Sequence, residues 1–400
     1  MQRLQAYQFK LCPRGPQSQE MRQIAGSCRF VYNKGLALQK DSYETEGKKL
    51  SYAALCKELT AWRHHEETAF LAQAPTHPLQ QSLRDLDRAY ANFFAGRAGF
   101  PKFKRKGRRD SFRYPDPQQV KLDQANGRVF LPKLGWIKYR KSRQVEGEIK
   151  QITVRSIAGN WYMSVHTERE VEIEKHPASS MVGVDVGIAI FATLSDGTTF
   201  EPANSYRRQE EKLRRAQRQL ARKQKFSANW RKQKQKVQRL HKKTADIRRD
   251  HLHKVSTTIS KSHAIIVVED LAVASMSKSA RGNMNQPGKN VRAKAGLNKS
   301  ILDQGWYEFR RQLEYKQTWR GGEVIAVAAH HTSQRCAVCE WVEADNRISQ
   351  SRFSCRRCGH AENADVNAAK NIEAAGRAVI ACRERPLGHS LKQEPTGSVA

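Results

Sequence analysis

Residues 336–372 hold four cysteines followed by an acidic residue, in the stretches Cys336-Ala-Val-Cys339, Cys355-Arg-Arg-Cys358 and Asn363-Ala-Asp-Val-Asn-Ala-Ala-Lys-Asn-Ile372. Two Cys-x2-Cys pairs at this separation are typical of a structural zinc site with tetrahedral thiolate ligation. We therefore predict that Cys336, Cys339, Cys355 and Cys358 bind zinc; the alternative is four free thiols. Because four thiolates close the site, any catalytic metal must bind elsewhere.

Three acidic residues are candidates for a second metal site. Asp185 lies in the apolar stretch Gly183-Val-Asp-Val-Gly187, Glu269 lies near the end of the apolar run 264–271, and Asp365 lies in the first turn of a predicted helix at 364–378. A carboxylate on an apolar strand is costly to bury unless it is paired or binds a metal. Each acid also has an ordinary alternative, as a turn residue, a strand-end surface charge or a helix N-terminal charge respectively.

The order of elements around the acids favours one shared site. A strand and its return strand, a long helical excursion, a central strand and an acid-bearing helix follow one another as in an RNase H-like nuclease core. In that architecture, acids from adjacent strands and a helix bind one or two Mg²⁺ ions, which activate water for phosphodiester hydrolysis. We predict that Asp185, Glu269 and Asp365 bind catalytic Mg²⁺.

The charge balance points to a polyanionic partner. The 400 residues include 72 Lys and Arg against 39 Asp and Glu, for a net charge of +33. A surface this basic predicts binding to nucleic acid. No apolar run is long enough for a membrane span and the N-terminus lacks a signal-peptide pattern, so we expect a cytoplasmic protein with no membrane partner. The other four cysteines are expected to be ordinary thiols.

The N-terminal half predicts strands with a helical insertion. Residues 5–12 alternate in polarity as a strand does, and helical spacing follows at 17–40, 51–65 and 78–95. Five short strands are then predicted, which suggest a barrel or sandwich completed by the first strand: Phe112–Tyr114, Val129–Leu131, Trp136–Tyr139, Ile149–Ser156 and Trp161–Thr167.

The C-terminal half predicts a different sequence of elements. Met181–Leu194 is expected to be one apolar strand, followed by a turn at Ser195-Asp-Gly-Thr198 and a return strand. A basic helical hairpin is predicted at 205–254, where 19 Lys and Arg face four acids, and we expect it to bind nucleic-acid backbone. The later expectations are a flexible stretch at 273–300, an amphipathic helix at 301–319 and a strand at Glu323–Ala328.

Two further segments are candidates for nucleic-acid contact. Residues 100–109 interleave aromatic and basic side chains, which can stack on bases and contact phosphate. The alternative for this segment is a solvated basic loop. Thr332–Arg335, just before the first cysteine pair, could contact substrate phosphate. The candidate contacts are Lys102, Phe103, Lys104, Arg105, Lys106 and Arg335.

The combined motifs resemble the OrfB/TnpB family of bacterial insertion sequences, whose members look ancestral to type V CRISPR effectors. The similar stretches include Gly183-Val-Asp-Val-Gly187, Val268-Glu-Asp-Leu271, Thr332-Ser-Gln-Arg-Cys336, Asp365-Val-Asn-Ala-Ala-Lys-Asn-Ile372, Cys28-Arg-Phe-Val-Tyr-Asn33 and Leu131-Pro-Lys-Leu-Gly-Trp136. The resemblance covers residues 5–378. Many relatives carry an acid at the position of Asn363, which leaves the level of activity open.

The resemblance implies an α+β multidomain fold. It implies a β-barrel wedge domain at 1–16 and 99–180, a helical recognition domain at 17–98, and a RuvC-like, RNase H-like nuclease domain at 181–329 and 363–380. A zinc ribbon at 330–362 would be inserted in the nuclease domain, and a disordered tail is expected at 381–400.

The resemblance also implies a function. It is RNA-guided, Mg²⁺-dependent cleavage of double-stranded DNA next to a transposon-adjacent motif, in support of transposon maintenance. The catalytic residues would be Asp185, Glu269 and Asp365, and His77 and Gln80 would contact the adjacent motif. The partners would be a guide RNA derived from the transposon end and the target DNA, bound by a monomer at the bacterial nucleoid. Two alternatives stay open: a transposase acting directly on transposon ends, and a non-catalytic zinc-ribbon DNA-binding regulator.

Overall fold

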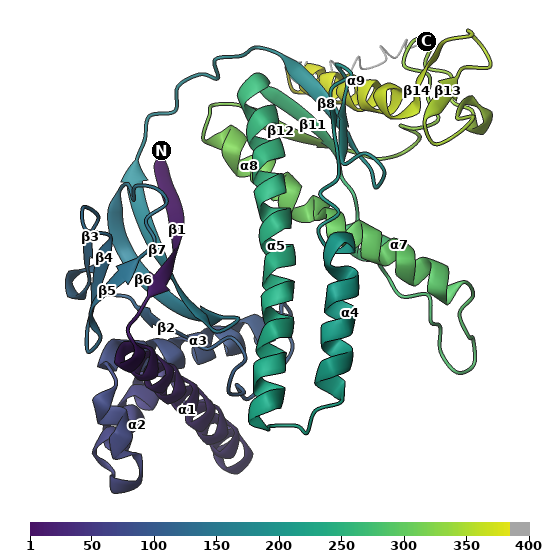
Figure 1. Cartoon of the computed structure of the whole chain (residues 1–400). Coiled ribbons are helices and arrows are strands. Elements are labelled where there is room, and N and C mark those ends of the chain that lie inside the picture. Colours follow the sequence, from purple (N-terminus) through teal and green to yellow (C-terminus); the bar gives the residue numbers. More distant parts are fainter. Residues whose placement is uncertain (385–400) are drawn as a thin grey trace, which may run out of the picture. The chain divides into compact units, whose positions relative to one another are not determined.

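A computed structural model of the chain describes residues 1–384 (Figure 1). The chain divides into two compact units: Met1–Glu172 with Lys234–Arg239, and Ile173–Gln233 with the residues from Leu240 onward. The last helix continues to Glu384. The first four residues of the expected disordered tail are therefore helical, and the rest of that prediction lies outside the described residues.

The first unit contains a seven-stranded sheet in the order β2-β6-β7-β1-β5-β4-β3. The strands are β1 (Gln2–Cys12), β2 (Ser111–Tyr114), β3 (Lys121–Asp123), β4 (Arg128–Leu131), β5 (Gly135–Tyr139), β6 (Glu148–Ile157) and β7 (Asn160–Glu170). β1 pairs with β7 along most of its length and with β5 at its end, so the first strand completes this sheet as predicted. The order ends at β2 and β3, so the pairings among the described strands do not close a hydrogen-bonded ring.

Helices interrupt this sheet between β1 and β2. They are α1 (Gly15–Glu46), α2 (Tyr52–His64), the 3-10 helix η1 (Glu66–Gln73) and α3 (Thr76–Phe94). The insertion was predicted from helical spacing, except for η1. Leu83 and Leu86 of α3 are fully buried, and a Cβ at Gly35 of α1 would lie 3.0 Å from Leu83 Cδ2. Glycine at this position lets the two helices approach closely.

The second unit contains a five-stranded sheet in the order β10-β9-β8-β11-β12. The strands are β8 (Met181–Val186), β9 (Ala192–Leu194), β10 (Thr199–Phe200), β11 (Ile265–Glu269) and β12 (Glu323–Val327). β11 is parallel to β8 and to β12, which confirms its predicted central place. The single strand expected over Met181–Leu194 is wrong: the chain turns after β8 and returns antiparallel as β9. Gly187 permits this turn, because a Cβ there would lie 2.7 Å from the carbonyl oxygen of Ile190.

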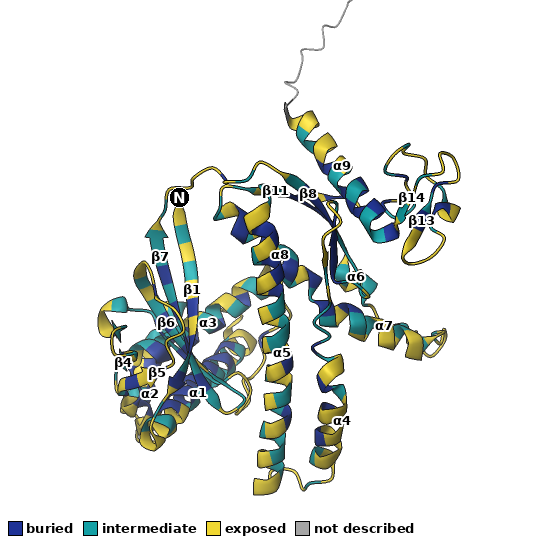
Figure 2. Ribbon diagram, turned by 45° about the horizontal axis from the view of Figure 1, so that its top comes forward, coloured by how far each residue is buried: buried dark blue, intermediate teal, exposed yellow. Residues whose placement is uncertain are grey.

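Helices of the second unit are α4 (Arg207–Ala221), α5 (Ala228–Ser262) except for its residues Lys234–Arg239, α6 (Val273–Met276), α7 (Val291–Gln304), α8 (Trp306–Thr318) and α9 (Ala364–Glu384). α4 and α5 form the predicted hairpin, and exposed residues occupy much of its surface (Figure 2). The helix expected at 301–319 is instead the end of α7 and all of α8. Gly305 separates them, because its φ of 75° is left-handed backbone that ends a helix. α7 also occupies part of the stretch expected to be flexible.

Different helices pack against the two faces of this sheet. Val184, Ile266 and Val268 belong to one core cluster with residues of α5 and α8, such as Leu252 and Phe309. Val267 of β11 instead packs in a second cluster with Ile372 of α9. Because successive side chains on a strand point to opposite faces, every other residue of β8 and β11 faces α9.

Candidate metal centres

Strand alternation places Asp185 and Glu269 on the face that α9 covers. Asp185 is one residue from Val184, and Glu269 is one residue from Val268, and both valines face the other way. The parallel register pairs Val268 with Val184, so the next position sets Glu269 beside Asp185. Both acids stand at the C-terminal ends of their strands, where a sheet exposes its edge to ligands.

Gly183 allows α9 to bring Asp365 to these strands. A Cβ on Gly183 would lie 2.0 Å from the carbonyl oxygen of Ala369 and 2.6 Å from the backbone nitrogen of Glu373, both in α9. The Ser195 hydroxyl links the same elements, since it accepts from the Gly183 N–H at 3.0 Å and donates to Glu373 Oε2 at 2.5 Å. Asp365 lies in the first turn of this tightly packed helix.

Under the nuclease activity that the resemblance implies, replacing Gly183 with alanine is expected to reduce DNA cleavage about a hundredfold, because a shift of α9 by about 1 Å would move Asp365 from its partners. The measurement is the initial rate of target cleavage, with circular dichroism to verify folding. Gly296→Ala is the matched control, since no atom lies within 4 Å of a Cβ there. A wild-type rate in Gly183→Ala would show that this packing does not position the acids.

The three carboxylates interact electrostatically. Burial, together with the charges of Glu269 and Asp365, raises the pKa of Asp185 to about 7, against an opposing effect of Arg347. Burial also raises the pKa of Glu269, partly offset by a hydrogen bond from Thr332. Such a concentration of negative charge suits a divalent cation, which favours carboxylate oxygen and would balance the repulsion. The chemistry of these residues therefore suits Mg²⁺. Among the residues that the structure describes, the cysteines are the one group of His, Cys, Asp or Glu whose ligand atoms already lie together.

Two residues outside the strands contact the acids. Thr332 is buried, and its hydroxyl donates to Glu269 Oε1 at 2.6 Å, so it orients this carboxylate. Arg347 Nη2 donates to Asp365 Oδ1 at 3.2 Å and to the Gln350 carbonyl at 2.9 Å. From the sequence, Thr332 was a candidate for contact with substrate phosphate, and Arg347 was not a candidate. Nothing in the pattern distinguishes Arg347 from the many other basic residues.

The four cysteines form a compact cluster. All four Sγ atoms lie within 4.8 Å of one another, with Cys336 and Cys358 3.7 Å apart and Cys339 and Cys355 3.5 Å apart. Thiolates at about 2.3 Å from a tetrahedral zinc are about 3.8 Å apart. The cluster therefore fits one zinc ion, as the spacing predicted. His330 and His331 are exposed and are not needed as ligands.

Each cysteine pair forms the same tight turn. The residue after each second cysteine, Glu340 or Gly359, has left-handed backbone with φ of 62° or 73°. Each turn is closed by a hydrogen bond from the first cysteine N–H, to the Trp341 carbonyl at 2.9 Å and to the His360 carbonyl at 2.8 Å. Fully buried Asn346 joins the two turns, since it donates to the Gln334 carbonyl and accepts from the Arg356 N–H.

Asparagines of α9 connect this cysteine-rich segment to the helix that carries Asp365. Asn367 accepts from the Ala337 N–H at 3.0 Å and donates to the Arg335 carbonyl at 2.8 Å. Asn371 donates to the carbonyls of Thr332 and Arg335 at 2.9 and 2.7 Å. Asn363 caps the helix by accepting from the N–H of Asp365 at 2.9 Å. The asparagine at 363 thus has a structural role at the start of α9.

The predicted nucleic-acid residues lie mostly in the first unit. Lys102, Arg105 and Lys106 are exposed, and Phe103 has a relative exposure of 50%. The backbone of Lys104 exchanges two hydrogen bonds with the Asn33 side chain of α1, and its ammonium lies 3.8 Å from the centre of the Tyr32 ring. His77 and Gln80 are half-buried on α3. In the second unit, Arg335 forms an ion pair with Glu340 at 2.5 Å. These contacts to nucleic acid stay predictions.

None of the helices that the structure describes is both long enough and apolar enough to cross a membrane.

Three family models match parts of the chain. The OrfB_IS605 model, described as "Probable transposase", matches residues 164–280. The model of the "Cas12f1-like, TNB domain" matches residues 306–372, which include the four cysteines. A "Helix-turn-helix domain" model of OrfB_IS605 proteins matches residues 1–48, where the structure has β1 and α1.

Whole-length relatives and a solved structure are also similar. The chain is 59% identical to "Putative RNA-guided DNA endonuclease InsQ" of Escherichia coli strain K12, over 99% of this chain and 98% of that protein. It is 35% identical to a "Putative RNA-guided DNA endonuclease" from Streptomyces pristinaespiralis, over 99% of this chain and 97% of the relative. The cryo-EM structure of a Cas12f1–sgRNA–target DNA complex matches with a TM-score of 0.56 at 13% identity, over 90% of this chain and 83% of the other. This last match shows similarity of fold.

Proposed function

This chain belongs to the OrfB/TnpB family of insertion-sequence proteins, and on that premise we propose that it is an RNA-guided, Mg²⁺-dependent DNA endonuclease. The observation that carries the proposal is the mutual interaction of Asp185, Glu269 and Asp365 at one edge of the second sheet. The relatives that match over nearly the whole chain support the same activity.

We infer a division of roles among the residues around the acids. Asp185, Glu269 and Asp365 would hold Mg²⁺, which when bound activates water and stabilises the charge on the phosphodiester. Thr332 fixes the orientation of Glu269 by its 2.6 Å hydrogen bond. Arg347 offsets part of the negative charge at Asp365 and supplies a cation beside the site where a phosphate would bind. The zinc cluster is structural, because its four thiolates leave no open position.

We propose the following domains. A β-barrel wedge comprises 1–16 and 99–180, a helical recognition domain comprises 17–98, and a RuvC-like nuclease domain of RNase H-like fold comprises 181–329 and 363–380, with a zinc ribbon at 330–362. The boundary between the two compact units, at Glu172–Ile173, is close to the proposed boundary at 180. The sheet order β10-β9-β8-β11-β12, with β9 antiparallel to β8, supports the nuclease assignment.

We propose that the partners are a guide RNA from the transposon end and double-stranded target DNA. The net charge of +33 favours binding to a large polyanion, and the basic hairpin α4–α5 supplies many of the cations. Base pairing between guide and target would carry most of the sequence specificity. His77 and Gln80 remain candidates for contact with the adjacent motif, and Lys102, Phe103, Lys104, Arg105, Lys106 and Arg335 for contact with nucleic-acid backbone.

The test is purification of the full chain expressed with its transposon end, followed by sequencing of the bound RNA. We expect one transposon-end RNA to co-purify and to direct Mg²⁺-dependent cleavage of a plasmid that carries the matching target. EDTA should abolish cleavage. A plasmid with a scrambled target is the control.

Two results would contradict this function. Strand-transfer products made without RNA would favour a transposase that acts on transposon ends, which shares the family description "Probable transposase". Tight DNA binding with no bound RNA and no Mg²⁺-dependent nicking would favour a non-catalytic DNA-binding regulator.

A further inference from the structure

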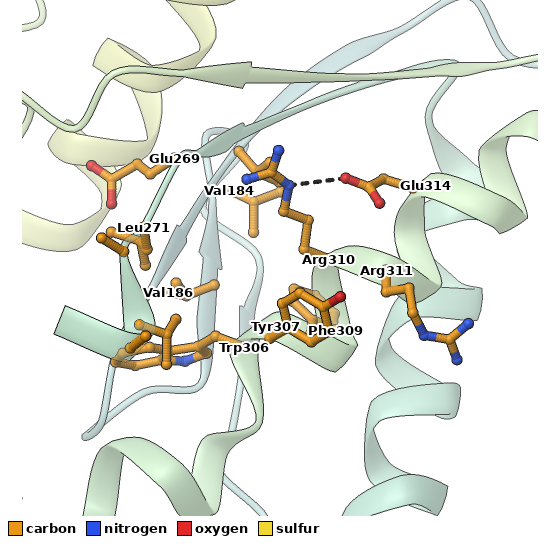
Figure 3. Close-up of a pocket in the computed structure, with 14 residues that line it drawn as sticks. Val184, Val186, Glu269, Leu271, Trp306, Tyr307, Phe309, Arg310, Arg311 and Glu314 are labelled. Atoms are coloured by element: carbon orange, nitrogen blue, oxygen red, sulfur yellow. Dashed lines mark hydrogen bonds and ion pairs between the residues drawn. The ribbon is translucent and has the colours of Figure 1, made fainter. Parts of the chain in front are cut away.

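A pocket of about 480 Å³ opens beside Glu269, on the face of the sheet opposite to α9. Its floor is apolar and is formed by alternate residues of β8 and β11, namely Val184, Val186 and Val268, together with Leu271. Figure 3 shows Glu269 and Leu271 on one side of the pocket and Tyr307 and Arg310 on the other. Glu269 lines the rim of the pocket, and its carboxylate points away from Trp306 and Tyr307 (Figure 3), so a ligand here would lie across the edge of the sheet from the proposed reaction centre.

The wall from α8 presents an aromatic ring that the fold leaves unpacked. The left-handed backbone of Gly305 separates α7 from α8. Trp306 and Tyr307 are the first two residues of α8. Trp306 is buried at the base of the pocket, whereas Tyr307 is 75% exposed. A largely exposed tyrosine at the mouth of an apolar pocket offers a free face for stacking.

The charges around the pocket favour a neutral ligand. Its lining includes two cations, Arg310 and Arg311, and two acids, Glu269 and Glu314. Arg310 is already paired, with Asp270 at 2.5 Å and with Glu314 at 2.9 Å. Balanced charge over an apolar floor does not attract a phosphate group into the pocket. It suits a flat, uncharged group whose faces can contact valine and tyrosine.

We propose that this pocket binds one unpaired nucleobase of the DNA strand being cut, one or two nucleotides from the scissile phosphate. The inference rests on the proposed nuclease function and adds a substrate feature to it. A strand that crosses the edge of the sheet would place its phosphate at the acids and a neighbouring base in the pocket. Proteins that bind single strands commonly stack bases on aromatic side chains. A base in a duplex is stacked and paired, so the site selects locally single-stranded DNA.

The first test is a scan of abasic sites in the displaced strand of the target, using the full chain with its bound RNA. We expect one position near the cut where loss of the base slows cleavage about tenfold, as loss of one stacked base implies. Tyr307→Ala should slow cleavage of intact DNA by a similar factor, yet add little on the abasic substrate. Tyr307→Phe should retain the wild-type rate. Leu302→Ala, which removes an exposed side chain of α7 outside the pocket, is the control.

A second test does not depend on cleavage. Single-stranded DNA with 2-aminopurine at each position in turn is bound to RNA-bound Asp185→Asn protein, and stacking should quench the fluorescence at one position. Adding Tyr307→Ala should restore the fluorescence, and Ala274→Leu should do the same by filling the pocket with an aliphatic side chain. Equal cleavage of all abasic substrates by an active complex would contradict the proposed base binding in the pocket and leave the proposed nuclease function unaffected. If the intact target is not cleaved at all, the nuclease function fails, and unquenched 2-aminopurine would then overturn the pocket separately.

Discussion

Asp185→Asn is expected to reduce DNA cleavage by at least about a thousandfold, because it removes one of the charged ligands that hold the catalytic metal. Asparagine keeps the size of the side chain and its place on β8, so the loss would report on charge and not on packing. The measurement is the initial cleavage rate of a matching plasmid by the RNA-bound protein at saturating Mg²⁺. Asp196→Asn, on the turn between β9 and β10, is a matched control because Asp196 is exposed and its carboxylate contacts the Thr198 N–H and His263.

The same substitution should stabilise the metal-free protein. The folded-state pKa of Asp185 is about 7, against an ordinary value of 3.8. The folded state therefore binds more protons than the unfolded state between these pH values, and stability falls as the pH rises from about 4 to about 7. The asparagine side chain does not titrate, so the variant should melt at a higher temperature than wild type at pH 8, with a smaller difference at pH 5. Mg²⁺ should raise the melting temperature of the wild type alone.

A lower melting temperature for Asp185→Asn at pH 8, together with unchanged cleavage, would contradict both parts of this prediction. It would mean that the charge of Asp185 stabilises the folded protein and has no part in cleavage. Differential scanning fluorimetry at pH 5 and pH 8, with and without Mg²⁺, distinguishes the cases.

Local pattern was enough to predict the two groups of metal-binding candidates. The cysteine spacing determines two tight turns, and those turns bring four sulfur atoms together wherever the segment lies. Asp185 and Glu269 were identifiable because a charge interrupts an apolar strand, and alternation then places both on one face. The order of elements, which is that of an RNase H-like core, supplied what local pattern could not: that the strands carrying the two acids are neighbours with a helix across them.

Predictions of strand and helix boundaries failed where the backbone conformation of a single residue reverses the chain or ends a helix. Apart from Asp185, Met181–Leu194 is nearly all apolar, so its polarity does not mark the reversal after β8. Gly187 marks it, but Gly183 of the same run lies within a strand that continues. The helical pattern at 301–319 likewise continues across Gly305, although the backbone there is left-handed. Arg347, Asn367 and Asn371 were missed for a different reason, because their partners lie on elements that only the folded chain brings together.

Loss of zinc is expected to abolish cleavage. The cause would be displacement of the catalytic acids, which the cysteine-rich segment helps to hold in place. The apolar core of the cysteine-rich segment comprises little more than Phe353, Ala364 and the cysteines, which is too small to fold without metal. Unfolding it would free Asn367 and Asn371 from their carbonyl partners, detach Thr332 from Glu269 and remove Arg347 from Asp365. Cys355→Ser should therefore lower bound zinc from about one per chain to none and reduce cleavage at least about a hundredfold.

The controls separate this effect from general damage. Cys56→Ser changes a thiol of α2 in the first unit, so zinc content and cleavage should stay at wild-type values. In Cys355→Ser, limited proteolysis should cut within residues 330–362 first, while the first unit keeps its protease resistance. Because the segment reaches Asp365 through named hydrogen bonds, Asn371→Leu should reproduce part of the loss of cleavage with zinc still bound. Full cleavage by a zinc-free Cys355→Ser protein would show that α9 holds Asp365 in place without the ribbon.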